Sequence, residues 1–292
     1  MASVRGDVGF PVRLRFTKHG KVRFVGHRDL ARSFERSFRI AALPLSFSLG
    51  FSPRPKVSLG LALGVGHESD GEYLDLELAE PIDIDALPAT LTETLPVGVE
   101  VNGAVALAPR APALQEAITS VEYDLRPADV PPSALQTVVE QAMASEHLPI
   151  ETTRKGRAVV EDLRPGLRRL ELRDDTVVEA EVATQPRGIR PAELIGALRG
   201  LAATPSGSGE DRVLRTHQWI ERDGARHEPL EADRATRASD DARAPSKGLI
   251  NARRDDDRGG GERAERPEHE ADGPEDRADD RAEAGALHRR IA

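Results

Sequence analysis

The sequence contains no cysteine. Disulfides, thiolate-bound iron–sulfur clusters, cysteine zinc sites and thiol nucleophiles are therefore excluded. Long apolar runs are also missing: no stretch approaches the roughly 18–20 residues of a membrane helix, and the N-terminus lacks the apolar segment of a signal peptide. We therefore expect a cytoplasmic protein that has no contact with a membrane.

Aromatic residues make up only 3% of the chain, and residues 221–292 contain none. That segment has fifteen lysines and arginines, twenty aspartates and glutamates, and, apart from alanine, only five leucines and isoleucines to bury. So few apolar side chains bury too little surface to offset the conformational entropy that is lost on ordering. We predict a disordered, acidic, low-complexity tail over residues 221–292.

Charge is distributed unevenly along the chain. The net charge is -9, yet residues 1–56 contain twelve lysines and arginines against three acids. A partner is attracted by the local field of a protein rather than by its total charge. The N-terminal part is therefore expected to present a positive surface.

The hydrophobic pattern of residues 1–220 alternates between a period of two and a period of about 3.6, which is typical of mixed sheet and helix. The segment APRAPA, residues 108–113, interrupts this pattern and separates two halves. Each half follows the order strand, helix, strand, strand, helix, strand of a ferredoxin-like split βαβ unit. We predict an α+β fold of two tandem ferredoxin-like domains, 1–108 and 114–220, followed by the tail. The predicted strands are 12–16, 57–61, 73–78, 99–107, 121–125, 149–153, 167–172, 177–182 and 213–220, and the predicted helices are 28–42, 84–95, 133–146 and 191–201.

The first predicted helix is strongly amphipathic. Leu30, Phe34 and Phe38 form one ridge, and a ridge of arginines is offset from it by two residues, or about 200°. The apolar ridge is expected to face the sheet and the arginines to face outward. A solvated helix face is one interpretation; binding of phosphate or carboxylate groups is the one we favour, because few acids lie nearby. The arginines of the ridge are Arg28, Arg32, Arg36 and Arg39, and Arg13, Arg15, Lys21 and Arg23 are expected to add outward charge.

A proline-stiffened loop, SFSLGFSPRPKVSLG at residues 46–60, follows this helix. Pro53 and Pro55 flank Arg54, so the loop is expected to present Arg54 and Lys56 on an ordered segment. We expect Phe47 and Phe51 to belong to the core, with stacking on bases as the alternative. In the second half, Arg187 and Arg190 flank a glycine turn before a predicted helix and are expected to aim at the same kind of anion.

No residues match a catalytic triad or a metal site by their spacing. His27 stands at the start of the basic helix, where it has either a structural role or, as the alternative, a role as general acid or base in RNA cleavage. The glycine-rich segment GVGHESDGEY, residues 64–73, lacks the Lys-Ser/Thr ending of a phosphate-binding P-loop. We therefore predict neither a metal nor a cofactor for this chain.

The segments FTKHGKVRFVGHRDLARSFERSFR and LPLSFSLGFSPRPKVSLGLALGVGHES resemble the signature of the radical SAM-linked protein family, and YDLRP, PRGIRP and RTHQW extend the resemblance. Members of that family are encoded beside, or fused behind, a radical SAM protein of the cobalamin-binding type. The resemblance implies an accessory module for a separate iron–sulfur enzyme. Gly26 departs from the pattern, since a small polar residue usually precedes the histidine of the family.

We therefore expect a noncatalytic accessory protein that binds tRNA or rRNA, or presents substrate, to a radical SAM partner. Two alternatives stay open: a metal-independent endoribonuclease that uses His27, and a protein–protein adaptor for the radical SAM enzyme that binds no nucleic acid. The predicted anion-binding residues are Arg15, Lys18, Lys21, Arg23, His27, Arg28, Arg32, Arg36, Arg39, Arg54, Lys56, Arg187 and Arg190.

Overall fold

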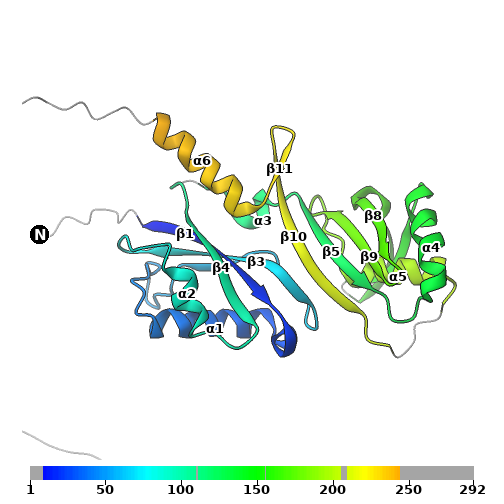
Figure 1. Ribbon diagram of the computed structural model, residues 1–292, viewed down its shortest axis with the longest axis horizontal. Helices are drawn as coiled ribbons and strands as arrows, with labels where there is room; N and C mark the ends of the chain where they lie inside the picture. Colours follow the sequence, from blue (N-terminus) through cyan, green and yellow to red (C-terminus); the bar gives the residue numbers. More distant parts are fainter. Residues whose placement is uncertain (1–8, 110, 155, 205–208, 244–292) are drawn as a thin grey trace, which may run out of the picture. The chain divides into compact units, whose positions relative to one another are not determined.

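The computed structural model describes residues 9–109, 111–154, 156–204 and 209–243, which belong to one compact unit. They form a mixed α/β fold around a large sheet (Figure 1). The predicted mixture of sheet and helices is confirmed. The strands are β1 (Phe10–Lys18), β2 (Val57–Leu59), β3 (Glu68–Leu78), β4 (Val99–Ala106), β5 (Ser120–Arg126), β6 (Pro149–Arg154), β7 (Arg157–Asp162), β8 (Leu167–Asp174), β9 (Val177–Ala183), β10 (Arg212–Arg222) and β11 (Ala225–His227).

The order of the strands in the large sheet is β4-β1-β3-β10-β5-β9-β8, with β2 paired to β3 and β11 paired to β10. The first half of the chain contributes β1 to β4, and all pairs among these strands are antiparallel. The second half contributes β5, β8, β9 and β10, again with antiparallel pairs. The two halves meet where β10 runs parallel to the start of β3, with Leu214 opposite Glu68 and Arg215 opposite Ser69. β6 and β7 form a separate hairpin.

Helices cover the sheet and bury its apolar side chains. In the first half, the core consists mainly of alternate residues of β1 and residues of the first long helix. The rings of Phe16 and Phe34 pack edge to face, with 4.8 Å between their centroids. The second half has its own core around Leu125, Val178 and Leu198. The helices are α1 (His27–Ile40), α2 (Leu87–Thr92), α3 (Leu114–Ala117), α4 (Pro132–Ala144), α5 (Pro191–Leu201) and α6 (Pro229–Arg243), with short 3-10 turns η1 (Gly20–Phe24) and η2 (Arg164–Gly166).

The C-terminal part of the described chain is ordered, so the prediction of disorder from residue 221 is wrong for residues 221–243. β10 continues to Arg222, β11 follows, and α6 packs on β4 and β1. Leu230 and Ala232 of α6 are buried, and Asp233 binds a buried arginine of β1. Composition does not reveal this packing because a few buried residues and one ion pair suffice to hold the helix on the sheet. Residues 244–292 of the predicted tail lie outside the described part.

α6 also explains a wrong prediction about β1. Val12, Leu14 and Phe16 face the core beneath α1, so Arg13 and Arg15 point to the opposite face of the sheet, as alternation requires. We expected that face to be open to solvent. It is covered by α6 instead, and Arg13 is completely buried there (Figure 1).

Candidate functional site

The arginine ridge of α1 faces solvent as predicted. Leu30, Phe34 and Phe38 are buried beneath the helix, whereas the four arginines are exposed. The helix begins after Gly26, with Asp29 in its first turn, and ends at Ile40, shortly before Ala42, whose φ of 50° is left-handed. The local sequence therefore sets both the length of the ridge and the face it occupies. The arginines are Arg28, Arg32, Arg36 and Arg39.

Few acidic side chains neutralise the charge of this arginine ridge. Within the described residues, the only ion pair made by the four arginines joins Arg32 Nη1 to Asp29 Oδ1 at 3.0 Å, one turn away on the same helix. Both side chains are exposed, and pairs of this kind contribute about 0–1 kcal/mol. The guanidinium groups are therefore available to an outside anion.

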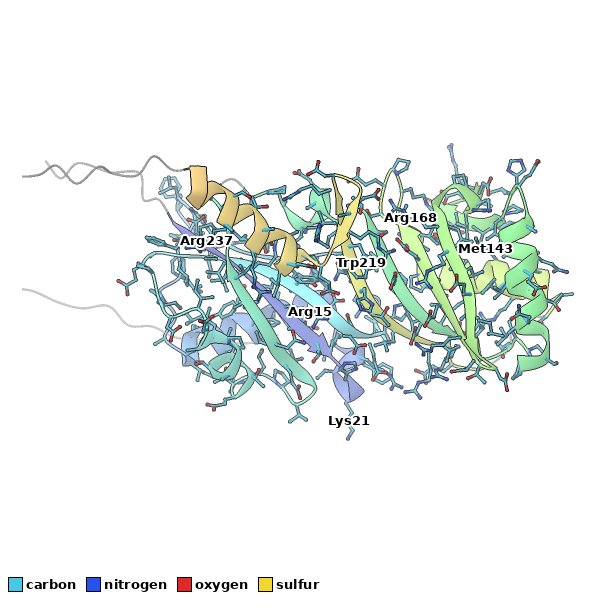
Figure 2. The ribbon with its side chains drawn as sticks, turned by 45° about the horizontal axis from the view of Figure 1, so that its top comes forward. Arg15, Lys21, Met143, Arg168, Trp219 and Arg237 are labelled. Atoms are coloured by element: carbon cyan, nitrogen blue, oxygen red, sulfur yellow. The ribbon has the colours of Figure 1, made fainter. Side chains whose placement is uncertain are left out.

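The 3-10 turn before α1 adds cations beside the ridge. Figure 2 shows Lys21 extending away from the fold, and the side chain is exposed. Arg23 is half-buried: its guanidinium lies 4.6 Å from the centre of the Phe24 ring and 3.4 Å from Glu210. Phe24 is itself exposed, so this turn presents a ring and a cation together. His27, the first residue of α1, is also exposed.

The loop between α1 and β2 carries apolar side chains in solvent. Phe47 is about half exposed, and Leu49 and Phe51 are fully exposed. The prediction that Phe47 and Phe51 belong to the core is therefore wrong. No described element covers the tip of this loop, which turns at Gly50 with a φ of 135°. Apolar residues are thus held outside the core by the turn.

The loop is held by its own backbone. The Ser48 amide donates to the Arg54 carbonyl at 2.8 Å, the Arg54 amide donates to Ser48 Oγ at 3.0 Å, and the Lys56 amide donates to the Ser46 carbonyl at 2.9 Å. Arg54 is exposed, as predicted. Lys56 is also exposed, but its Nζ lies 2.6 Å from Glu77 Oε1, so part of its charge is balanced.

Two predicted anion-binding residues of β1 are not on this surface. Lys18 is buried, and its Nζ donates to the carbonyl of Arg23 at 3.2 Å. Burial lowers the pKa of Lys18; nearby Glu72 acts in the opposite direction, and Arg215 lowers the pKa further. Arg15 is partly buried next to Glu228, with 3.2 Å between Nε and Oε2. Neither side chain is free to meet an RNA backbone.

Several arginines on the strands of the second half differ from those of α1 because acids balance them. Arg226 pairs with Glu122 and Glu181 and also lies 4.5 Å from the centre of the Trp219 ring. Similar pairs join Arg168 to Glu221 and Arg173 to Asp124. Arg187 pairs with Glu161 and Glu193, while Arg190 is exposed at the start of α5.

Most of the predicted residues that remain accessible follow one another along the chain on η1, α1 and the next loop. We call these exposed or half-buried residues the basic surface. Sequence reasoning missed two exposed apolar residues on the same segments, Phe24 and Leu49; the turn residues around Gly50 were the available signal for Leu49. Within the described ranges, no group of three or more histidines, aspartates and glutamates is placed to hold a metal ion, and no helix is long and apolar enough to span a membrane. The basic surface consists of Lys21, Arg23, His27, Arg28, Arg32, Arg36, Arg39 and Arg54.

Comparison with protein families gives one match. The model described as "Uncharacterized protein conserved in bacteria (DUF2344)" matches residues 12–191. The matched range runs from β1 to the first residue of α5 and includes the whole basic surface. A search of curated proteins found no match.

Proposed function

The chain belongs to the DUF2344 family of proteins conserved in bacteria, and we propose that it is a noncatalytic accessory protein that binds RNA, tRNA or rRNA, through the basic surface. The observation that carries this proposal is the exposed arginine ridge of α1, which makes, within the part of the chain that the structure describes, a single ion pair, to Asp29 of its own helix. On a chain with a net charge of -9, such a concentration of unbalanced guanidinium groups favours a polyanion. Arginine binds phosphate oxygens with two parallel hydrogen bonds.

The exposed aromatic rings favour unpaired nucleotides over a double helix. Phe24, Phe47 and Phe51 lie on the same segments as the cations. Bases of a single strand stack on such rings, and each stacked base contributes roughly 1–3 kcal/mol. Loops and ends of a folded RNA offer these bases. The aliphatic stems of the arginines and the phenylalanines would then contact the strand together.

We propose that the partner of this chain is a radical SAM enzyme. The resemblance of residues 16–75 to the radical SAM-linked family supports this partner, and the chain has no cysteine with which to bind an iron–sulfur cluster itself. In this proposal the chain holds the RNA, and the partner carries out the chemistry.

We also interpret each half as a ferredoxin-like split βαβ unit. The strand orders are β4-β1-β3-β2 and β10-β5-β9-β8, so in both halves the first strand lies between the last and the third of its unit. On this interpretation the β6–β7 hairpin is an insertion in the second unit.

The test is a measurement of RNA binding by the full chain at several salt concentrations. We expect the affinity for tRNA or rRNA to fall steeply between 50 and 200 mM salt, because each neutralised phosphate releases counterions. The double substitution Arg32→Ala and Arg36→Ala is expected to weaken binding and to make the logarithmic salt slope shallower by about 1.4, or 0.7 for each single-strand phosphate contact.

A matched control is provided by Arg157 and Arg234, which are exposed outside the basic surface. Arg157→Ala with Arg234→Ala makes the same change in net charge, and we expect it to leave the slope unchanged. Absent or salt-insensitive binding, or equal losses in the two double variants, would contradict the proposal.

One observation favours a second candidate, the protein–protein adaptor. Leu49 is fully exposed at the tip of the loop. Burial of an aliphatic side chain against an apolar protein surface is more favourable than its contact with a base. An adaptor would co-purify with the radical SAM enzyme after nuclease treatment and would lose that interaction on Leu49→Ser. The RNA-binding protein would instead release its partner when the RNA is digested.

A further inference from the structure

A cavity lined by none of the residues of the basic surface lies between the two halves of the sheet and the start of α5. Its volume is about 570 Å³. Side chains from β5, β9 and β10 form its floor, the segment 61–67 forms one wall, and residues 188–192 form the other. Cavities that bind small molecules typically have volumes of roughly 300–1,000 Å³. The size alone therefore permits a ligand of metabolite dimensions.

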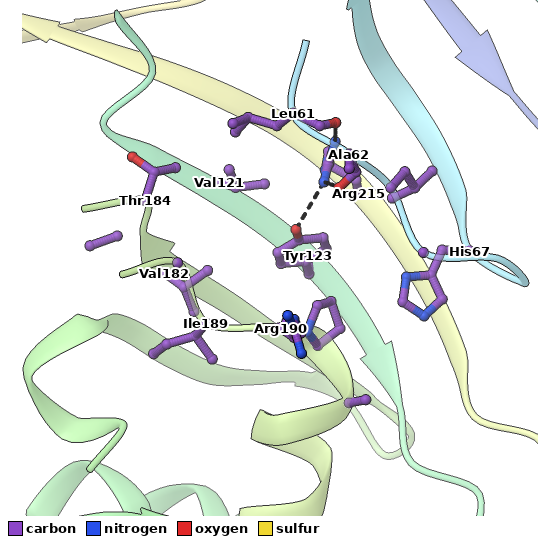
Figure 3. A pocket seen from close by; sticks show the side chains of 16 residues that line it. Leu61, Ala62, His67, Val121, Tyr123, Val182, Thr184, Ile189, Arg190 and Arg215 are labelled. Atoms are coloured by element: carbon purple, nitrogen blue, oxygen red, sulfur yellow. Dashed lines mark hydrogen bonds between the residues drawn. The ribbon is translucent and has the colours of Figure 1, made fainter. Parts of the chain in front are cut away.

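The two ends of this cavity differ in chemistry (Figure 3). Leu61, Val121 and Val182 form an apolar end, with Ile189 below them. His67 and Arg215 lie toward the opposite side, and Arg190 lies beside Ile189, below the Tyr123 ring. A ligand that matches the cavity therefore has an apolar body and one polar group at its end.

Arg215 builds the polar end and is itself almost completely enclosed, with 3% of its side chain exposed. Its Nη1 donates to Glu72 Oε1 at 2.9 Å. Nη1 also donates to the Leu61 carbonyl at 3.0 Å, and Nη2 donates to the Ala62 carbonyl at 3.0 Å and to Tyr123 Oη at 3.2 Å (Figure 3). These bonds fix the wall at residues 61–62. Among the described residues, its buried Nε has no hydrogen-bond partner.

Positive charge exceeds negative charge around this buried arginine. Arg215 and Lys18 are both buried, and the buried acid between them is the single carboxylate of Glu72. This excess of positive charge affects His67. Burial lowers the pKa of His67 most, the charges of Arg215 and Lys18 lower it further, and Asp211 raises it. A buried site with more cations than acids is stabilised when an anion binds.

The start of α5 adds a third positive contribution. Arg190 precedes the helix and lines the cavity, as do Pro191 and Ala192 of its first turn. Pro191 has no amide hydrogen, and the Arg190 amide donates to Glu193 Oε2 at 3.0 Å. The Ala192 amide is therefore the group at this helix start that can favour a bound negative charge. Glu193 does not line this cavity; it binds Arg187, with 2.6 Å between the Arg187 Nη2 and Glu193 Oε1 atoms.

We propose that this cavity binds a small organic anion, with its carboxylate or phosphate at the end formed by Arg190 and Arg215 and its apolar body against Val121, Val182 and Ile189. The proposal goes beyond RNA binding, because none of these residues belongs to the basic surface. The anion is either a free metabolite or the terminal phosphate of a larger molecule, which share this chemistry.

The test compares four probes that have the same eight-carbon chain and differ in the end group: octanoate, octyl phosphate, octanol and octylammonium. We expect titration calorimetry of the full chain to give one site for octanoate or octyl phosphate, with an affinity at least tenfold above that for octanol and octylammonium. Equal binding of the neutral and anionic probes would overturn the proposal, and so would a lack of binding by all four.

A second measurement separates the two sources of the anion. A short RNA with a terminal phosphate is added to the complex with the bound probe. Competition between the RNA and the probe indicates the larger molecule, and a lack of competition indicates the free metabolite.

Substitutions of residues that line the cavity test whether the probe binds there. Arg190→Gln removes an exposed charge and is expected to weaken octanoate at least fivefold, and Ala192→Trp is expected to fill the mouth and abolish binding. Arg39→Gln, on α1, is the control and should bind as the wild type does. Unchanged binding in both cavity variants would contradict the assignment. The double substitution of Arg32 and Arg36 should leave octanoate binding intact, so failure of one proposal is distinguishable from failure of the other.

Discussion

Arg13 and Asp233 form a buried ion pair, with 2.8 Å between Nη1 and Oδ2, although they are 220 positions apart in the sequence. The same guanidinium binds both carboxylate oxygens of Asp75, at 2.7 and 2.8 Å. One arginine of β1 thus connects β3 to the C-terminal helix. This connection makes α6 part of the fold rather than an appendage.

The first prediction concerns this pair. Asp233→Ala removes one of the two acids around a buried arginine, and we expect it to lower the free energy of unfolding by about 1–3 kcal/mol, since Asp75 still compensates the charge. Asp233→Asn keeps a hydrogen-bond acceptor and should therefore lower the free energy of unfolding by less than Asp233→Ala does. Arg234→Ala, on the exposed side of the same helix, serves as the control in urea denaturation of the full chain. Equal midpoints for the wild type and Asp233→Ala would show that α6 does not stabilise the fold.

The second prediction contrasts two phenylalanines. Phe34 is fully buried against Phe16, and Phe51 is fully exposed. Phe34→Ala should therefore destabilise the protein by about 3–5 kcal/mol, whereas Phe51→Ala should change stability by less than about 0.5 kcal/mol. Phe51→Ala is instead expected to weaken RNA binding by about 1–3 kcal/mol through lost stacking. Thermal or urea denaturation gives the first pair of values, and RNA titration gives the last; a stability loss in Phe51→Ala without an affinity loss would refute the expectation.

The third prediction is a pH dependence that arises from His67. Because its folded pKa lies below the ordinary value of 6.5, the unfolded chain binds a proton between the two values and the folded chain does not. Stability should therefore fall as the pH is lowered through 6.5, by up to about 1.4 kcal/mol per pH unit, until the folded pKa is reached. Above 6.5 this contribution is constant.

His67→Gln removes this titration, so its stability should depend less on pH than that of the wild type. Urea denaturation at pH 7.5, 6.5 and 5.5 gives the comparison. Parallel curves for the two proteins over this range would exclude His67 as the source.

The fourth prediction separates binding from cleavage. As a noncatalytic protein, the purified chain should leave tRNA and rRNA intact in EDTA over the time in which a known ribonuclease digests them. His27→Ala should then change binding alone. Cleavage by the wild type that disappears in His27→Ala would instead establish the endoribonuclease alternative, in which this exposed histidine transfers a proton.

The sequence predicts α1 and β1 well because their patterns are local. The alternation of Val12, Leu14 and Phe16 and the spacing of Leu30, Phe34 and Phe38 each require only that one face of the element be buried. β3 was predicted from residue 73 but begins at Glu68, where polar residues join the sheet by pairing with β10. A local pattern contains no information about such a partner.

The errors in the candidate site have the same origin. Arg13 was expected to face solvent because a charged residue on an alternating strand normally does, and only the distant α6 reverses this. Phe47 and Phe51 were expected in the core because apolar residues usually pack there, but Phe47 is about half exposed and Phe51 is fully exposed. The cavity at Arg215 was missed because its residues come from segments far apart in the chain. The predicted domain bounds, 1–108 and 114–220, stay a prediction.

The position of β10 has a consequence for protein synthesis. It follows β1 to β9 in the chain, yet it occupies the middle of the large sheet between β3 and β5. While the ribosome is still translating residues 212–222, the facing edges of those two neighbours have no strand between them, and open edges are prone to pair with other chains. The nascent protein thus completes its sheet from the centre, and only after most of its length has emerged.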